Sequence, residues 1–169
     1  METITRVEQL LPGQLGQLFI YISMIAALIS CIGYYFAAKK ENTIDGGTWL
    51  KFGRWSFITH AAAVFLAFGT LYYIISNHLF EYYYAWRHPS VGLDPKYLFA
   101  SFWEGGEGSF LLWMFWQALL GLVLVYKSKE WESRTMFVVA LVQLLLSTFI
   151  LGIYITPDFA KKYGSKKLA

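Results

Sequence analysis

The chain has little charge for its length. Only 15% of its 169 residues are charged, whereas 57% are hydrophobic. Soluble domains carry about a quarter charged residues, so this composition excludes an ordinary soluble domain and indicates an integral membrane protein. The length leaves room for one small helix bundle and for no separate soluble domain. Hydropathy is therefore the first guide to the fold.

Cysteine is also scarce, and the net charge is small. The one cysteine, Cys31, lies inside an apolar run, so the chain forms no internal disulfide, and the thiol is expected to pack as a small hydrophobe. The formal net charge is only +3, and the basic residues gather in connectors and in the tail. This distribution suits membrane orientation and argues against nucleic-acid binding.

Four apolar runs are the main feature that the sequence does contain. They cover residues 15–38, 55–76, 109–126 and 135–155. A helix needs about 20 residues to cross a hydrocarbon core, and the third run is short unless its helix begins earlier, in the glycine-rich stretch before it. The sequence predicts an all-α polytopic membrane bundle of about four transmembrane helices over residues 1–155. A lysine-rich tail follows at 156–169.

The connectors differ in their content of lysine and arginine. The first, 39–54, is predicted to be polar with a turn at Asp45-Gly46-Gly47, and it holds four basic residues; the third, 127–134, holds three. The longer second connector, 77–108, holds only Arg87 and Lys96. Because cytoplasmic loops carry the excess, the second connector is predicted on the outer face. The four lysines of the tail oppose this orientation, which suggests that an intact protein continues beyond Ala169.

The second connector is unusually aromatic. Tyrosine and tryptophan recur from Tyr82 to Trp103, and disordered segments contain few aromatics, so we expect it to fold on the membrane surface. Flat aromatic surfaces with a few polar groups suit a planar apolar ligand such as a porphyrin or a quinone. Interfacial anchoring explains the same aromatics. Composition does not choose between these interpretations.

One stretch, YLFASFWEGGEGSFLLW at 97–113, places two carboxylates and three glycines between aromatics. Ionised carboxylates at membrane depth are costly, so Glu104 and Glu107 are functional candidates. Glycines permit close approach of a ligand or another backbone. The simpler interpretation is the start of an interfacial helix, capped by Ser109 or by a carboxylate. Both interpretations stay open at this point.

Polar side chains within the spans are the remaining candidates. His60, in the second span, is a candidate haem or metal ligand, although a hydrogen bond to another helix is the more common role. Gln117 and Gln143 are expected to bond between helices. His88, in the outer connector, is a lone loop histidine, which is usually solvated. No two histidines are three or four residues apart, so the sequence predicts no metal site.

The motif residues resemble a known family. The run FWEGGEGSFLLW, preceded by EYYYAWRHPSVGLDPKYLFASF, is similar to the N-terminal region of the CcmF/CcsA cytochrome c assembly family. The positions that match are Trp103, Glu107, Gly108, Ser109, Leu111, Leu112 and Trp113, with His88 matching an upstream histidine. Glu104 stands where the family often has glycine, and Gly106 where it often has histidine or glutamine. The family's tryptophan-rich haem-binding signature does not occur in this sequence.

The resemblance implies a function in cytochrome c biogenesis. The chain would be a scaffold part of a haem lyase in the bacterial inner membrane, with haem held jointly with the remaining haem-lyase segment or subunit and delivered to apocytochrome c. The residues implied as support for a haem platform are Trp103, Glu107, Gly108, Trp113 and His88. No catalytic residue follows from the resemblance, and enzymatic activity stays open.

Two other functions are compatible with the composition. The first is a small membrane subunit of a quinone-linked respiratory complex, in which the aromatic connector 77–108 forms the rim of a quinone site. The second is a bundle with a purely structural role. Co-purification with haem-handling or with respiratory chains separates these alternatives.

Overall fold

The computed structural model describes residues 10–41, 43–77, 79 and 105–155. These residues form four long helices and one short 3-10 helix, and they contain no strand. The elements are α1 (Leu11–Lys39), α2 (Ile44–Ser76), α5 (Gly106–Lys127), η2 (Lys129–Trp131) and α6 (Glu132–Ile155). All four long helices have the length and hydropathy to cross a membrane. The predicted all-α membrane bundle is therefore confirmed.

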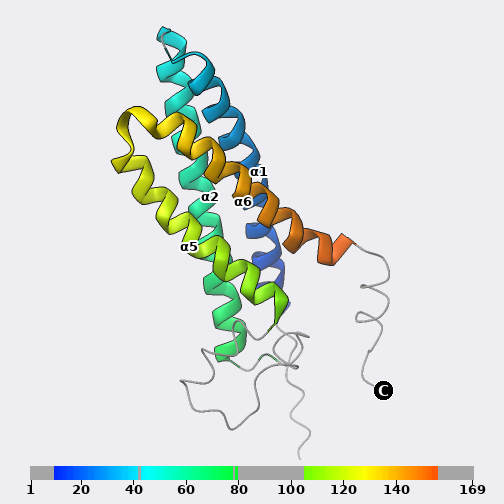
Figure 1. Ribbon diagram of the computed structural model, residues 1–169. Coiled ribbons are helices and arrows are strands. Elements are labelled where there is room, and N and C mark those ends of the chain that lie inside the picture. Colours follow the sequence, from blue (N-terminus) through cyan, green and yellow to red (C-terminus); the bar gives the residue numbers. More distant parts are fainter. Residues whose placement is uncertain (1–9, 42, 78, 80–104, 156–169) are drawn as a thin grey trace, which may run out of the picture.

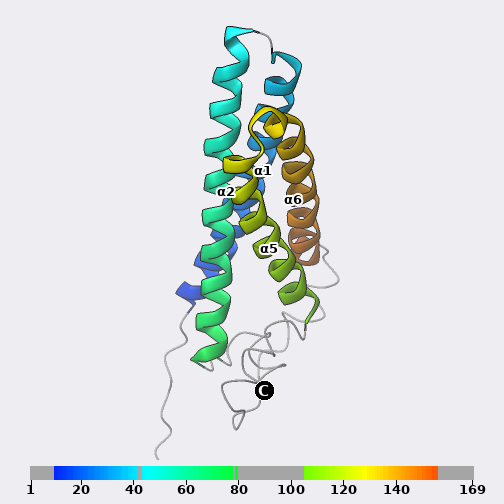
Figure 2. The ribbon, with the colours of Figure 1, turned by 60° about the vertical axis from the view of Figure 1, so that its left-hand side comes forward.

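The long helices run up and down as two antiparallel hairpins (Figure 1, Figure 2). Helix α1 packs against α2 and α6, and α5 packs against the same two helices. The short connections 40–43 and 128–131 lie at one end of the bundle, which we call the turn end. At the other end, which we call the open end, α1 and α5 begin and α2 and α6 finish.

Helix α2 begins at Ile44, so the prediction of a polar connector over 39–54 with a turn at Asp45-Gly46-Gly47 is wrong. Those three residues form the first turn of the helix. A Cβ on Gly46 would lie 2.2 Å from the carbonyl oxygen of Lys40, so the glycine permits a tight approach between successive helices. The ring of Trp49 packs against Phe36 on α1, with centroids 4.9 Å apart, and this contact supports the helical extension.

Two other helix starts differ from the apolar runs. Helix α1 begins at Leu11, with Pro12 in its first turn, where a missing backbone N–H costs no hydrogen bond. Helix α6 begins at Glu132, three residues before the predicted Thr135. Hydropathy misses this start because the first turn of α6 is polar, although Glu132 itself is buried.

Small residues bring α1 and α2 together. A Cβ on Gly33 would lie 2.8 Å from the Cα of Gly53, so the two backbones touch. The hydroxyl of Ser30 donates to the carbonyl oxygen of Gly53 over 3.1 Å. Close approach of this kind is the usual basis of helix association in a membrane, because apolar side chains gain little free energy when they move from lipid to a helix contact. Cys31 is buried nearby, as the sequence predicts.

Candidate functional site

The backbone of α5 shows where the helix begins within the glycine-rich stretch. Gly105 is the N-cap residue, with φ −95° and ψ 158°, and the N–H of Ser109 donates to its carbonyl oxygen over 3.1 Å. Helix α5 therefore begins within the glycine-rich stretch, which lengthens the third span as the sequence suggests. Ser109 is the fourth residue of the helix, so its predicted role as the cap is wrong. An extended glycine precedes the helix in its place.

Three of the five candidate haem-platform residues lie on α5. Glu107 is the second residue of the helix, a position where the helix dipole favours negative charge; its side chain is outside the described part. Gly108 is buried, whereas Trp113 is 59% exposed. The Trp113 ring lies edge-on to Phe110, with centroids 5.4 Å apart. Gly108 thus faces the bundle and Trp113 faces outward.

The other two candidates, Trp103 and His88, lie outside the described residues. So do nearly all of the connector 77–108 and the whole of the tail 156–169. A common site for the five candidates therefore stays a prediction.

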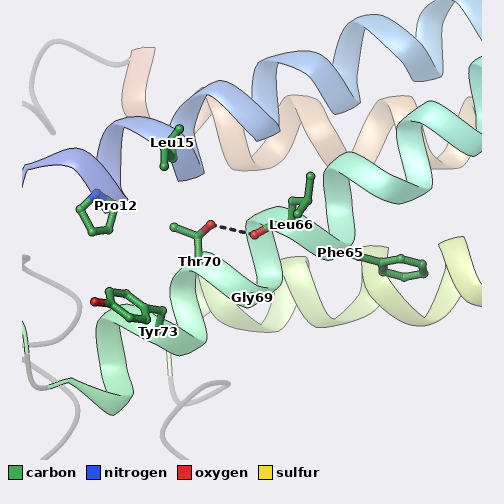
Figure 3. A pocket seen from close by; sticks show the side chains of 7 residues that line it. All are labelled: Pro12, Leu15, Phe65, Leu66, Gly69, Thr70 and Tyr73. Atoms are coloured by element: carbon green, nitrogen blue, oxygen red, sulfur yellow. Dashed lines mark hydrogen bonds between the residues drawn. The ribbon is translucent and has the colours of Figure 1, made fainter.

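A shallow apolar groove lies between α1 and α2 toward the open end (Figure 3). Its volume is about 340 Å³, and it is lined by Pro12, Leu15, Phe65, Leu66, Gly69, Thr70 and Tyr73. The hydroxyl of Thr70 donates to the carbonyl oxygen of Leu66 over 2.8 Å. Its methyl group faces α1, because a Cβ on Gly16 would lie 3.4 Å from it. The groove therefore presents hydrocarbon, which suits a lipid chain or an apolar side chain.

Of the three polar residues for which the sequence predicts bonds between helices, His60 and Gln143 make them, whereas Gln117 makes none among the described residues. His60 is fully buried, and its Nδ1 lies 2.8 Å from the carbonyl oxygen of Ser23 on α1. The amide nitrogen of Gln143, on α6, donates to the carbonyl oxygen of Met114 on α5 over 2.9 Å. His60 is the only histidine in the part of the chain that the structure describes. Enclosed by packed helices, it does not fit the role of a haem ligand.

A polar cluster at the turn end was missed by the sequence reasoning. The carboxylate of Glu132 is only 1% exposed and accepts hydrogen bonds from two nitrogens of Arg54, with 2.6 Å between Nε and Oε1. The hydroxyl of Tyr34 donates to the same carboxylate over 3.5 Å. Arg134 also pairs with Glu41 over 3.1 Å. These contacts tie the α5–α6 hairpin to the α1–α2 hairpin.

A sequence signal for this cluster does exist. Arg54 and Glu132 both fall at the boundaries of apolar runs, in the two connectors whose basic residues predict the same membrane side. Opposite charges at one membrane side are candidates for pairing, although the sequence alone does not say which pair forms.

The described residues contain no group of three histidine, cysteine, aspartate or glutamate side chains that could hold a metal ion. They also leave no accessible histidine for haem.

Comparison with known proteins shows a likeness in fold. No family model matches the sequence, and no curated protein matches it. A solved structure, cytochrome c haem lyase CcmF, matches with a TM-score of 0.73 over 92% of this chain, at 23% sequence identity. The chain has the fold of part of a cytochrome c haem lyase. It spans 25% of the length of that haem lyase chain.

The haem lyase likeness confirms the predicted resemblance at the level of the fold. At 23% identity it compares backbones, and it assigns no role to any single residue. The matched structure is named a haem lyase and not a subunit of a respiratory complex.

Proposed function

We propose that this chain is a membrane scaffold in cytochrome c biogenesis that works together with a haem-lyase segment or subunit. The fold likeness to the haem lyase CcmF carries the proposal, since it extends over 92% of the chain. The motif at 103–113 supports it independently, because the sequence resemblance points to the same family. This chain spans a quarter of the matched protein, so the partner would supply the haem ligands and the attachment chemistry.

The described residues support a scaffold role. The Arg54–Glu132 pair fastens the two hairpins to each other at the turn end. At the open end, α2 finishes and α5 begins, so the connector 77–108 joins the bundle there. With Glu107 and Gly108 in the first turn of α5, the described part of the motif lies on a helix held by the bundle. Haem and apocytochrome c would meet this face on the outer side of a bacterial inner membrane.

The motif is tested by two substitutions and two matched controls. Glu107→Gln and Trp103→Ala should lower the yield of holocytochrome c severalfold while the protein still inserts into the membrane. Glu130→Gln and Trp131→Ala change the same residue types in the exposed connection at the turn end, and their yields should equal that of the wild type. The measurement is haem covalently bound to cytochrome c, normalised to the amount of this chain in the membrane fraction. Normal yields from both motif variants would exclude a role for the motif.

The partner is tested by affinity purification of the chain from its native membranes in mild detergent, with the co-purifying chains identified by mass. Recovery of a chain that bears a tryptophan-rich haem-binding signature would support a split haem lyase. Recovery with respiratory subunits alone would mean that the fold likeness reflects ancestry, and the quinone-linked function would replace the proposal.

A further inference from the structure

The positive charge of the described residues is gathered at the turn end. Three cations there are held in ion pairs, which are Lys40–Asp45, Arg54–Glu132 and Arg134–Glu41. The cations that stay outside an ion pair among the described residues are all exposed; they are Lys39, Lys51, Lys127 and Lys129. One exposed acid at this end, Glu130, is also outside an ion pair. The surface of the turn end therefore carries a net positive charge.

Lys51 and Lys127 lie at the same level on neighbouring helices. Helices α2 and α5 pack against each other, and a Cβ on Gly121 of α5 would meet the ring of Phe57 on α2. From this contact, each of the two lysines is six residues nearer the turn end, which is about 9 Å along a helix axis. Lys129 follows in the connection to α6. Three lysines outside ion pairs therefore lie at the turn end of the contact between α2 and α5, which we call the α2–α5 seam.

Arg54 lies next to Lys51, one helical turn away on the same side of α2. Its Nε and Nη2 donate to the carboxylate of Glu132, which is 1% exposed, so the guanidinium is held in a fixed position. A guanidinium has five N–H donors, and the pairing with Glu132 uses only part of them. Because the Arg54 side chain is 39% exposed, donors remain for a group outside the bundle.

Exposed aromatic side chains accompany these cations. Trp55 is 70% exposed and Tyr126 is 78% exposed. Lys51 precedes Trp55 by four residues, one turn nearer the start of α2 on the same side of the helix, and Lys127 directly follows Tyr126. Tryptophan and tyrosine are enriched at the headgroup level of a membrane. The lysines therefore lie at the level of the lipid phosphates or just to the aqueous side of it.

The surface on the membrane side of these aromatics is hydrocarbon. Leu119, Leu120 and Val123 on α5 are exposed, and each is further from the turn end than Tyr126. Lipid tails are as apolar as these side chains. A ligand with an anionic head and an apolar tail would therefore meet cations at one level and hydrocarbon at the next.

The backbone of Lys129 adds an independent observation. Its φ is 42°, in the left-handed region that residues other than glycine, asparagine and aspartate seldom adopt. Glycine would make this turn without strain, and backbone strain is concentrated at functional sites. At Lys129 the chain thus carries a charge next to Lys127 in a turn that a lysine makes less easily than a glycine.

We propose that the turn end of the α2–α5 seam binds the headgroup of an anionic phospholipid. Lys51, Lys127 and Lys129 would attract the phosphate, and the exposed donors of Arg54 would donate to its oxygens. Basic groups beside membrane helices on the cytoplasmic side bind anionic headgroups, and the basic connectors predict that the turn end is cytoplasmic. This inference does not depend on the proposed role in cytochrome c biogenesis.

A bound headgroup would brace α2 against α5. At the same end, Arg54 already joins α2 to α6 through Glu132. The lipid would thus add a second link between the two hairpins, on the side where α5 ends.

The test is native mass spectrometry of the full chain in detergent, titrated with phosphatidylglycerol or with phosphatidylcholine of the same acyl chains. Each bound lipid adds a resolved mass, so the affinity for the first lipid is measured directly. One lysine near an anionic surface is worth about a fivefold change in affinity. The first phosphatidylglycerol should therefore bind at least about fivefold more tightly than the first phosphatidylcholine. Added salt should reduce this ratio, because it screens the charges.

Lysine variants localise the site. Lys51→Gln should reduce the ratio by up to about fivefold, and Lys51→Gln/Lys127→Gln/Lys129→Gln should abolish the preference. Arg54 stays unchanged in both variants because it also holds Glu132. Lys39→Gln is the matched control, since Lys39 is an exposed lysine outside an ion pair at the same end, on α1, which packs against α2 and α6. The control should keep the wild-type ratio, and circular dichroism should confirm that every variant keeps its helices.

Four results would overturn the proposal. One is equal affinity of the wild type for the two lipids. Another is an equal loss of preference in the Lys39→Gln and Lys51→Gln variants, which would indicate diffuse attraction to the whole turn end. A mass increase from inorganic phosphate alone, without a preference between the lipids, would assign the cations to a free anion. A ratio unchanged by the triple substitution, with a co-purified protein chain lost only from that variant, would assign them to a protein partner.

Discussion

The two ends of the bundle are built in different ways. At the turn end, a carboxylate that is 1% exposed is held by Arg54, and the backbones of α1 and α2 touch at Gly33 and Gly53. Toward the open end, an apolar groove of about 340 Å³ separates the same two helices, and an extended glycine precedes α5. The turn end therefore fixes the hairpins relative to each other. Among the described residues, α1 and α2 are in looser contact toward the open end.

The largest expected effect comes from breaking the charge cluster at the turn end. Glu132→Ala leaves Arg54 without its partner and removes the acceptor of Tyr34. Loss of one member of a buried ion pair costs about 3–5 kcal/mol, and we expect the lower end because the Arg54 side chain is 39% exposed and can regain water. The measurement is the unfolding free energy in mixed micelles. Glu130→Ala, in the exposed connection nearby, should change it by less than about 0.5 kcal/mol; equal effects would contradict a structural role for the cluster.

A smaller effect is expected from the helix contact at the turn end. Gly33→Ala would place a Cβ 2.8 Å from the Cα of Gly53, so α1 and α2 must separate, at a cost of about 1–3 kcal/mol. Gly16→Ala, on the same helix at the open end, meets the methyl group of Thr70 at an ordinary 3.4 Å. It should be neutral or slightly stabilising. Thermal unfolding of the two variants side by side would reveal the asymmetry, and a reversed order would refute the comparison.

The smallest effect is expected in the groove. A Cβ on Gly69 meets nothing within 4 Å, and alanine favours a helix over glycine by up to about 1 kcal/mol. Gly69→Ala should therefore raise the unfolding free energy by about 0.5–1 kcal/mol. Gly53→Ala, on the same helix at the turn end, should lower it, because its Cβ would lie 3.1 Å from the Tyr34 ring. A stability loss in Gly69→Ala would mean that the groove is tightly packed in the membrane.

Much of the fold was predictable because the hydropathy of consecutive residues is enough to identify a membrane-spanning helix. Four apolar runs became four helices, and the start of α5 within the glycines followed from the shortness of the third run. The start of α2 was predicted too late, because Asp45-Gly46-Gly47 has the composition of a turn. In the structure, Gly46 is required for close packing against Lys40 rather than for a loop. A composition rule does not distinguish these two uses of glycine.

The candidate site was predictable only in part. Bonds from His60 and Gln143 to neighbouring helices were expected from their polarity within apolar runs, and both are present. The sequence did not indicate that His60 would meet the carbonyl oxygen of Ser23 and Gln143 that of Met114. Those partners depend on how the helices are rotated against one another.

By itself, the sequence determined that the chain is a bundle of four membrane helices with its motif at the start of one of them. These properties depend on residues that are neighbours along the chain, so the hydropathy of a window of consecutive residues predicts them. Only the tertiary structure decided that Arg54 pairs with Glu132, that Gly33 meets Gly53, and that His60 meets Ser23. The members of each pair are far apart in sequence, and helix packing, which satisfies volume and hydrogen bonds together, brings them into contact.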